Sequence, residues 1–121
     1  MMDEFLSDLS YASIPDEHYR WQLLEPVRFR SARIGQVIVV PGGFECDLTS
    51  IPRPLWGFFP PMGPYAAAAV VHDYLYSIRW PDRRTADQIF LDAMASLGVP
   101  WWQRQLFYAS SRISGGHAWR T

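Results

Sequence analysis

A histidine and an aspartate in the second half of the chain are placed for acid–base chemistry. His72 lies in an apolar stretch that favours a helix, and Asp87 follows a short turn near Arg79 and Trp80. Because the two lie at similar distances from that turn, an antiparallel pair of helices would bring them together. A carboxylate bonded to one imidazole nitrogen fixes the tautomer and leaves the other nitrogen to accept a proton from water. The spacing therefore predicts a general-base dyad of His72 and Asp87.

A second aspartate, Asp73, points about 100° around the same helix from His72. The segment expected to face it is the loop of residues 42–47, which begins with two glycines and ends at Asp47. Carboxylate oxygens and backbone carbonyls are the ligands that calcium prefers. Asp73 and Asp47 are therefore candidate calcium ligands, and a cation there would stabilise an oxyanion on an ester or phosphodiester substrate.

Each of these residues also has a structural interpretation. A histidine on a packed helix is often a hydrogen-bonded core residue, and its contact with Asp87 would then only join two helices. Asp87 lies near a helix N-terminus, where the dipole favours a carboxylate, and Thr85 with Gln88 resembles a capping box. Asp47 opens a segment typical of a turn in which side chains bond to backbone amides.

The elements that must position these residues follow from the pattern of apolar residues, prolines and glycines. Strands are predicted over Trp21–Phe29 and Gln36–Val40, and together they form a twisted hairpin. Pro26 indicates an edge strand or a bulge in the first, because proline cannot donate to the ladder. Residues 1–18 are expected to form a loosely held arm, or a short helix followed by a turn.

Three helices are predicted in the second half, over about Tyr65–Ile78, Arg84–Leu97 and Pro100–Ser114, the last ending at Gly115-Gly116. On the second and third helices, apolar residues recur with a 3.6-residue period, which predicts one core-facing stripe on each. The stripe of the second helix is Ala86, Ile89, Phe90, Ala93, Met94 and Leu97, and that of the third is Trp102, Leu106, Ala109 and Ile113.

Between the strands and the helices, the proline-rich segment Cys46–Pro64 predicts an ordered loop filled by Trp56, Phe58 and Phe59. These aromatic residues and the stripe of the third helix are expected in the core; the alternative is an apolar groove for an acyl chain or a partner. The fold class is α+β. Residues 1–121 form one domain, in which an N-terminal β-hairpin and the aromatic loop pack on a three-helix array containing a helical hairpin.

Composition limits the classes of partner. The chain has 121 residues and a formal net charge of −1, so it lacks the positive field that attracts nucleic acid. The lone Cys46 cannot form an internal disulfide. The acidic N-terminus does not resemble a standard export signal, and the longest apolar run, Ala66–Val71, is far shorter than the ~20 residues that cross a bilayer.

Four segments carry a resemblance to a known family. They are VPGGF at residues 40–44, DLTSIPRPLW at 47–56, AVVHDYLY at 69–76, and RTADQIF at 84–90 followed by Ala93-Met94. In order and spacing these segments resemble the phage and prophage family DUF1353, a domain of unknown function, over roughly residues 21–120. The resemblance implies that the chain is encoded by a phage or prophage.

A further likeness concerns the helices. His72-Asp73 followed by Tyr76, and then Asp87, is similar to the active-site helices of short bacterial secreted phospholipases A2. The likeness implies His72 as the base, Asp73 as a calcium ligand and Asp87 as the residue that orients His72. The chain departs from those enzymes because they carry disulfides, are exported, and have a calcium loop that does not align with residues 42–47.

Three hypotheses about function follow. The first is a calcium-assisted hydrolase of lipid or cell-envelope esters, with His72 and Asp87 as catalytic residues. The second is a structural virion component, of the tail, that contacts other phage virion proteins and uses the His72–Asp87 contact as a staple between helices. The third is a regulator that binds a host protein through residues 56–59. The expected location is the host cytoplasm or the phage virion.

Overall fold

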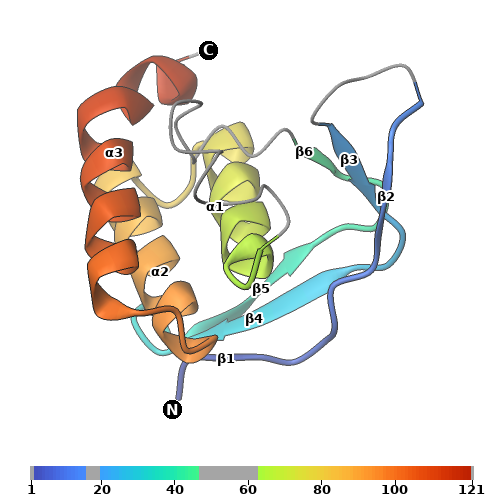
Figure 1. Cartoon of the computed structure of the whole chain (residues 1–121), viewed down its shortest axis with the longest axis horizontal. Coiled ribbons are helices and arrows are strands. Elements are labelled where there is room, and N and C mark those ends of the chain that lie inside the picture. Colours follow the sequence, from blue (N-terminus) through green and yellow to red (C-terminus); the bar gives the residue numbers. More distant parts are fainter. Residues whose placement is uncertain (1, 16–19, 47–62, 121) are drawn as a thin grey trace.

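Strands occupy the first part of the chain and helices the last, as the sequence predicts. The computed structural model describes residues 2–15, 20–46 and 63–120. Its helices are α1 (Ala66–Ile78), α2 (Arg83–Ser96) and α3 (Trp101–Arg120) (Figure 1). Its strands are β1 (Glu4–Phe5), β2 (Tyr11–Ser13), β3 (Trp21–Leu23), β4 (Val27–Ser31), β5 (Gln36–Val40) and β6 (Glu45–Cys46). The α+β fold class is confirmed.

The described strands form two antiparallel sheets, with orders β1-β4-β5 and β2-β3-β6. The predicted hairpin is present as β4 and β5, which pair from Val27 with Val40 to Ser31 with Gln36. The predicted strand Trp21–Phe29 is wrong as one unit, because it divides at Pro26 into β3 and β4, which belong to different sheets. Proline has no N–H to donate, so the ladder is interrupted there.

The N-terminal residues are paired rather than loose. β1 pairs with β4 through Glu4 opposite Arg30, and β2 pairs with β3 through Tyr11 opposite Leu23. Between β1 and β2, the hydroxyl of Ser7 accepts a hydrogen bond of 2.8 Å from the backbone N–H of Arg28. The described part of the expected arm therefore completes both sheets.

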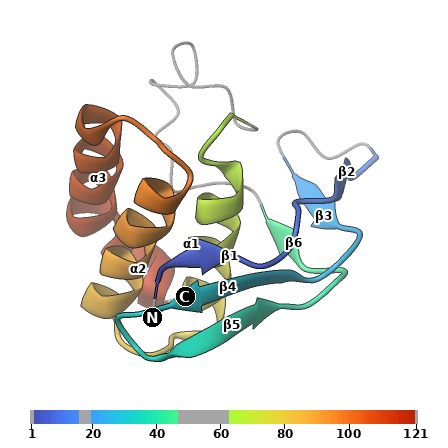
Figure 2. The same cartoon turned by 90° about the horizontal axis from the view of Figure 1, so that it is seen from below.

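The helical hairpin of α1 and α2 packs on the β1-β4-β5 sheet. Figure 2 shows this sheet beneath the two helices, with α3 on their outer side. Alanines at the start of α1 favour a helix, and Gly98, with φ 77°, follows the end of α2. Both boundaries agree with the predicted helices to within one residue. The core joins Val27, Phe29 and Val40 of the sheet to Val70, Leu75, Phe90, Met94 and Phe107 of the helices.

Two predictions about α3 are wrong. The helix does not end at Gly115-Gly116 but continues to Arg120, because Tyr76 and Arg83 pack against these glycines. The predicted core stripe is exposed, with Ile113 86% exposed, whereas Phe107 is fully buried. Phe107 packs its ring against Tyr65 and Phe90, so the opposite face of α3 meets the core.

The predicted capping box of Thr85 and Gln88 is displaced by three residues. Asp82 caps α2, and its side chain accepts a hydrogen bond from the backbone N–H of Thr85. Asp87 consequently lies beyond the first turn, and its charge is balanced by side chains rather than by free helix N–H groups.

Two of the predictions lie outside the described residues. These are the aromatic loop with Trp56, Phe58 and Phe59, and the candidate ligand Asp47. Among the described residues, no helix is long and apolar enough to cross a membrane.

Candidate functional site

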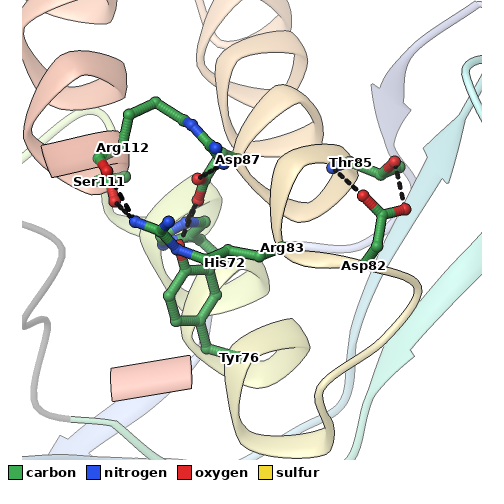
Figure 3. Close-up of polar contacts among 8 residues, drawn as sticks. All are labelled: His72, Tyr76, Asp82, Arg83, Thr85, Asp87, Ser111 and Arg112. Atoms are coloured by element: carbon green, nitrogen blue, oxygen red, sulfur yellow. Dashed lines mark hydrogen bonds and ion pairs between the residues drawn. The ribbon is translucent and has the colours of Figure 1, made fainter. Parts of the chain in front are cut away.

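The turn between α1 and α2 brings His72 and Asp87 into contact. α1 ends where Arg79 adopts a left-handed conformation, with φ 53° and ψ 51°, and α2 begins directly after Asp82. His72 Nε2 lies 2.7 Å from Asp87 Oδ1 (Figure 3). The contact expected from the placement of the two residues about this turn is present.

Two further side chains bind Asp87. The hydroxyl of Tyr76 donates a hydrogen bond of 2.6 Å to Oδ1, and Nη1 of Arg112 donates one of 2.8 Å to Oδ2 (Figure 3). Tyr76 lies one helical turn after His72, so the sequence places both on one face of α1. Arg112 lies on α3, and no local pattern connects it with Asp87. We call His72, Tyr76, Asp87 and Arg112 the Asp87 network.

Within the Asp87 network, the His72–Asp87 pair is enclosed. The side chain of His72 is 4% exposed and that of Asp87 is 0% exposed, whereas Arg112 is 30% exposed. Aromatic side chains contact the imidazole: Phe90 stacks on it at 4.4 Å between ring centroids, and Tyr76 lies at the same distance in a tilted arrangement. The predicted general base would take a proton from water, whereas this pair lies in the protein interior.

Burial and hydrogen bonding act in opposite directions on the charges. Burial lowers the pKa of His72, and this outweighs the raising effect of Asp87. Burial raises the pKa of Asp87, but hydrogen bonds from His72, Tyr76 and Arg112 hold that pKa below its ordinary value. A neutral imidazole beside a carboxylate must place its proton on Nε2, which leaves Nδ1 as the basic nitrogen.

Arg83 fixes α3 against the start of α2. Its Nη2 donates hydrogen bonds of 2.7 Å to the carbonyl of Ser111 and 2.8 Å to the carbonyl of Arg112 (Figure 3). The backbone that carries Arg112 is thus held at a set distance from α2. Sequence reasoning missed both arginines, because their partners lie 28 and 25 residues away.

Only one of the two predicted calcium ligands lies among the described residues. Asp73 is half-buried on α1, and Asp47 lies outside the described residues. Within residues 2–15, 20–46 and 63–120, no three His, Cys, Asp or Glu side chains are grouped so that they could hold a metal ion. The described side chains do not build a calcium site by themselves, and the role of Asp73 stays a prediction.

One protein-family model matches most of the chain. The model described as a protein of unknown function, DUF1353, matches residues 21–111. This chain belongs to the DUF1353 family. The match includes His72, Tyr76 and Asp87 and ends one residue before Arg112. No curated protein and no solved structure matches the chain.

Proposed function

We propose that this DUF1353 protein is a structural component of a phage particle, in which the His72–Asp87 pair joins helices and performs no catalysis. The observation that carries the proposal is the enclosure of the pair, with side chains 4% and 0% exposed. A general base must reach the proton that it abstracts, directly or through one water. An enclosed pair instead acts as a staple between α1 and α2.

The bonding of Asp87 supports the same role. Its Oδ1 accepts hydrogen bonds from His72 and Tyr76, and its Oδ2 accepts one from Arg112, so one carboxylate links all three helices. Donors that satisfy a buried carboxylate offset the cost of removing it from water. The network therefore makes the helical array rigid.

The outer face of α3 supports an assembly role. Its apolar stripe of Trp102, Leu106, Ala109 and Ile113 is exposed. Exposed apolar side chains that gather on one face are typical of surfaces that contact other proteins. A particle component needs such a surface, and the phage assignment itself comes from the resemblance of the four sequence segments.

Substitution of His72 by Gln tests the staple. We expect the full-length variant to lose roughly 1–3 kcal/mol of unfolding free energy, because it alters the donor on a buried carboxylate. Asp92→Asn is the control, because Asp92 is on the same helix but pairs with Arg33 at the surface. Unchanged melting of His72→Gln would contradict the structural role. Absence of the chain from purified particles of the encoding phage would contradict the particle assignment.

A second candidate is the calcium-assisted hydrolase of lipid or cell-envelope esters. It is favoured by the attachment of Asp87 to Nε2, which leaves Nδ1 of His72 as the basic nitrogen. In this candidate His72 is the base, Asp87 orients it, and Asp73 with Asp47 holds calcium. A bound calcium would stabilise negative charge on the substrate.

One assay separates the two candidates. The purified chain is incubated with phospholipid vesicles with and without calcium, and released fatty acid is measured for the wild type and His72→Gln. The structural role predicts no release above the blank. The hydrolase predicts calcium-dependent release that His72→Gln abolishes while its melting temperature stays unchanged.

A further inference from the structure

Strand β5 forms one edge of the β1-β4-β5 sheet (Figure 2). Among the described residues it has a hydrogen-bonded neighbour, β4, on one side only. The opposite edge differs, because β1 has only two residues and carries the charge of Glu4. Natural proteins shield sheet edges with charged residues, prolines or bulges. β5 has the sequence QVIVV, without a charge or a proline, and its register with β4 is unbroken, so its edge lacks this protection.

The hydrogen bonds of β4 show which backbone groups of β5 point outward. The carbonyl of Arg28 accepts a hydrogen bond of 2.8 Å from the N–H of Leu6. The N–H of Arg28 donates to the hydroxyl of Ser7, so both backbone groups of Arg28 point toward the N-terminal strand. Val39 lies opposite Arg28 and therefore forms a non-hydrogen-bonded pair with it. The N–H and C=O groups of Val39, and by the same alternation those of Val37, point away from β4 toward the open edge.

The side chains beside this edge are apolar. Val37 and Val39 are 42% and 44% exposed on the outer face of the sheet, and they alternate with the buried Ile38 and Val40 on the inner face. When an extended peptide adds a strand to a sheet, main-chain hydrogen bonds give affinity and contacts with alternate side chains give specificity. β5 offers both kinds of contact to an extended segment.

One charge beside the edge indicates the chemistry of that segment. Arg28 is exposed and shares the outer face with Val39, its partner in the register. Within the described part of the chain no carboxylate pairs with Arg28, whereas Arg30 pairs with Glu4. An arginine can lay its aliphatic stem along an apolar neighbour while its guanidinium stays in water. The guanidinium can therefore extend across Val39 toward an added strand, which would lie about 10 Å from β4. A carboxylate on that strand would complement it.

A second copy of this chain fits the edge less well. Antiparallel pairing of two β5 strands about Ile38 would place Val37 of one copy beside Val39 of the other. The backbone bonds would form, but Arg28 of one copy would then share a row with Arg30 of the other. That row adds a positive charge and supplies no unpaired carboxylate. The charges therefore favour a different chain that carries an acidic residue.

We propose that the open edge of β5 binds an extended segment of another protein, which adds an antiparallel strand to the sheet and places an acidic residue beside Val39, within reach of Arg28. This inference goes beyond the proposed structural role, because it names a surface other than the outer face of α3 and the chemistry of its partner. It requires neither particle assembly nor hydrolysis.

Labelled peptides test the partner chemistry. The probe is a short fluorescent peptide in which valines alternate with threonines and the central threonine is replaced by glutamate. We expect its anisotropy to rise to saturation as the full chain is added, and about twofold to fivefold weaker binding when glutamine replaces the glutamate. Arg28→Gln should remove this preference, whereas Arg84→Gln, which changes an exposed arginine of α2, should keep it. Absence of binding overturns the proposal, and so does equal binding of the two peptides by the wild type.

Substitutions of Val39 test pairing at the edge. Val39→Pro removes an outward N–H and none of the bonds to β4, so we expect at least about tenfold weaker binding. Val39→Thr keeps the N–H and should retain binding. If Val39→Pro does not fold, N-methylation of the glutamate and threonines of the probe replaces it, because their N–H groups would face β5; N-methylation of the valines is the matched control. Undiminished binding of Val39→Pro, or of the first methylated peptide, overturns edge pairing.

Sedimentation of the chain alone distinguishes this partner from a second copy. The proposal predicts that Val39→Pro leaves the sedimentation coefficient of the wild type unchanged. A dimer that Val39→Pro dissociates would show that β5 pairs with itself and would overturn the proposal. These measurements use the isolated full chain, so their failure is distinct from failure of either proposed function.

Discussion

Asp87 is a carboxylate with no exposed surface, and taking such a charge out of water costs several kcal/mol. His72, Tyr76 and Arg112 offset that cost with hydrogen bonds to both carboxylate oxygens. Charge-assisted hydrogen bonds are roughly twice as strong as neutral ones. The free energy of burying the Asp87 carboxylate thus depends on all three donors being in place.

Removing the charge of Asp87 should be strongly destabilising. We expect Asp87→Asn to lose roughly 3 kcal/mol or more of unfolding free energy, since an amide cannot serve three donors and leaves Arg112 uncompensated. Asp92→Asn, which breaks an exposed pair with Arg33, should lose about 0–1 kcal/mol. Urea unfolding of both variants measures the difference. Equal losses would show that the Asp87 network contributes no more than a surface ion pair.

Helix α2 depends on the side chain that caps its N-terminus. The side chain of Asp82 accepts hydrogen bonds from the backbone N–H of Thr85, at 3.0 Å, and from its hydroxyl, at 2.6 Å. The same cap fixes the end of the turn that sets Asp87 opposite His72. Local capping and the geometry of the site are therefore coupled.

Loss of this cap should weaken the hairpin. Asp82→Ala is expected to lower the melting temperature, because the N–H of Thr85 loses its acceptor. Asp82→Ser keeps an N-cap oxygen and should lower the melting temperature less. Thermal melting of the two variants supplies the comparison, and a loss as large for serine as for alanine would exclude capping as the cause.

The orientation of α3 can also be tested by substitution. Phe107 is fully buried, so Phe107→Ala should cost roughly 3–5 kcal/mol through lost burial and the resulting cavity. Ile113→Ala on the exposed face should change stability by no more than about 0.5 kcal/mol. Denaturant unfolding measures both. The reverse order would place the stripe predicted from the sequence in the core after all.

The whole molecule should lose stability in acid because two buried groups titrate differently once the chain unfolds. The pKa of His72 is lowered in the folded protein. Below about pH 6.5, the unfolded chain therefore binds a proton on this imidazole that the folded chain does not bind. Stability therefore falls as the pH drops from 6.5 toward the folded pKa. Asp87 adds a second loss, from 3.8 downward, because its folded pKa is also lowered.

The histidine part of this profile can be isolated. Melting temperatures of the wild type should fall between about pH 7 and about pH 5, and His72→Gln should flatten that interval while leaving the loss at lower pH. Asp92→Asn is the control, because Asp92 pairs with Arg33 rather than with His72. A wild-type profile without slope in that interval would contradict a buried, neutral His72.

The sequence alone determined the features that depend on short stretches of chain. The boundaries of α1 and α2 followed from prolines and Gly98, and the hairpin of β4 and β5 followed from its β-branched residues. The contact of His72 with Asp87 was also within reach, because it spans 15 residues across one tight turn. Such features form from local hydrogen bonds and periodicity, which sequence patterns record directly.

The buried face of α3 and the surroundings of Asp87 depend instead on how the helices pack together. Two faces of α3 carry apolar residues, and the one with the cleaner period, including Ile113, is exposed. The rotation of α3 depends on the shape of α1 and α2: Arg83 binds its carbonyls, and Gly115 admits Tyr76. Arg112 reaches Asp87 through that same rotation. Contacts between elements distant in sequence depend on how surfaces fit, and no local period encodes that fit.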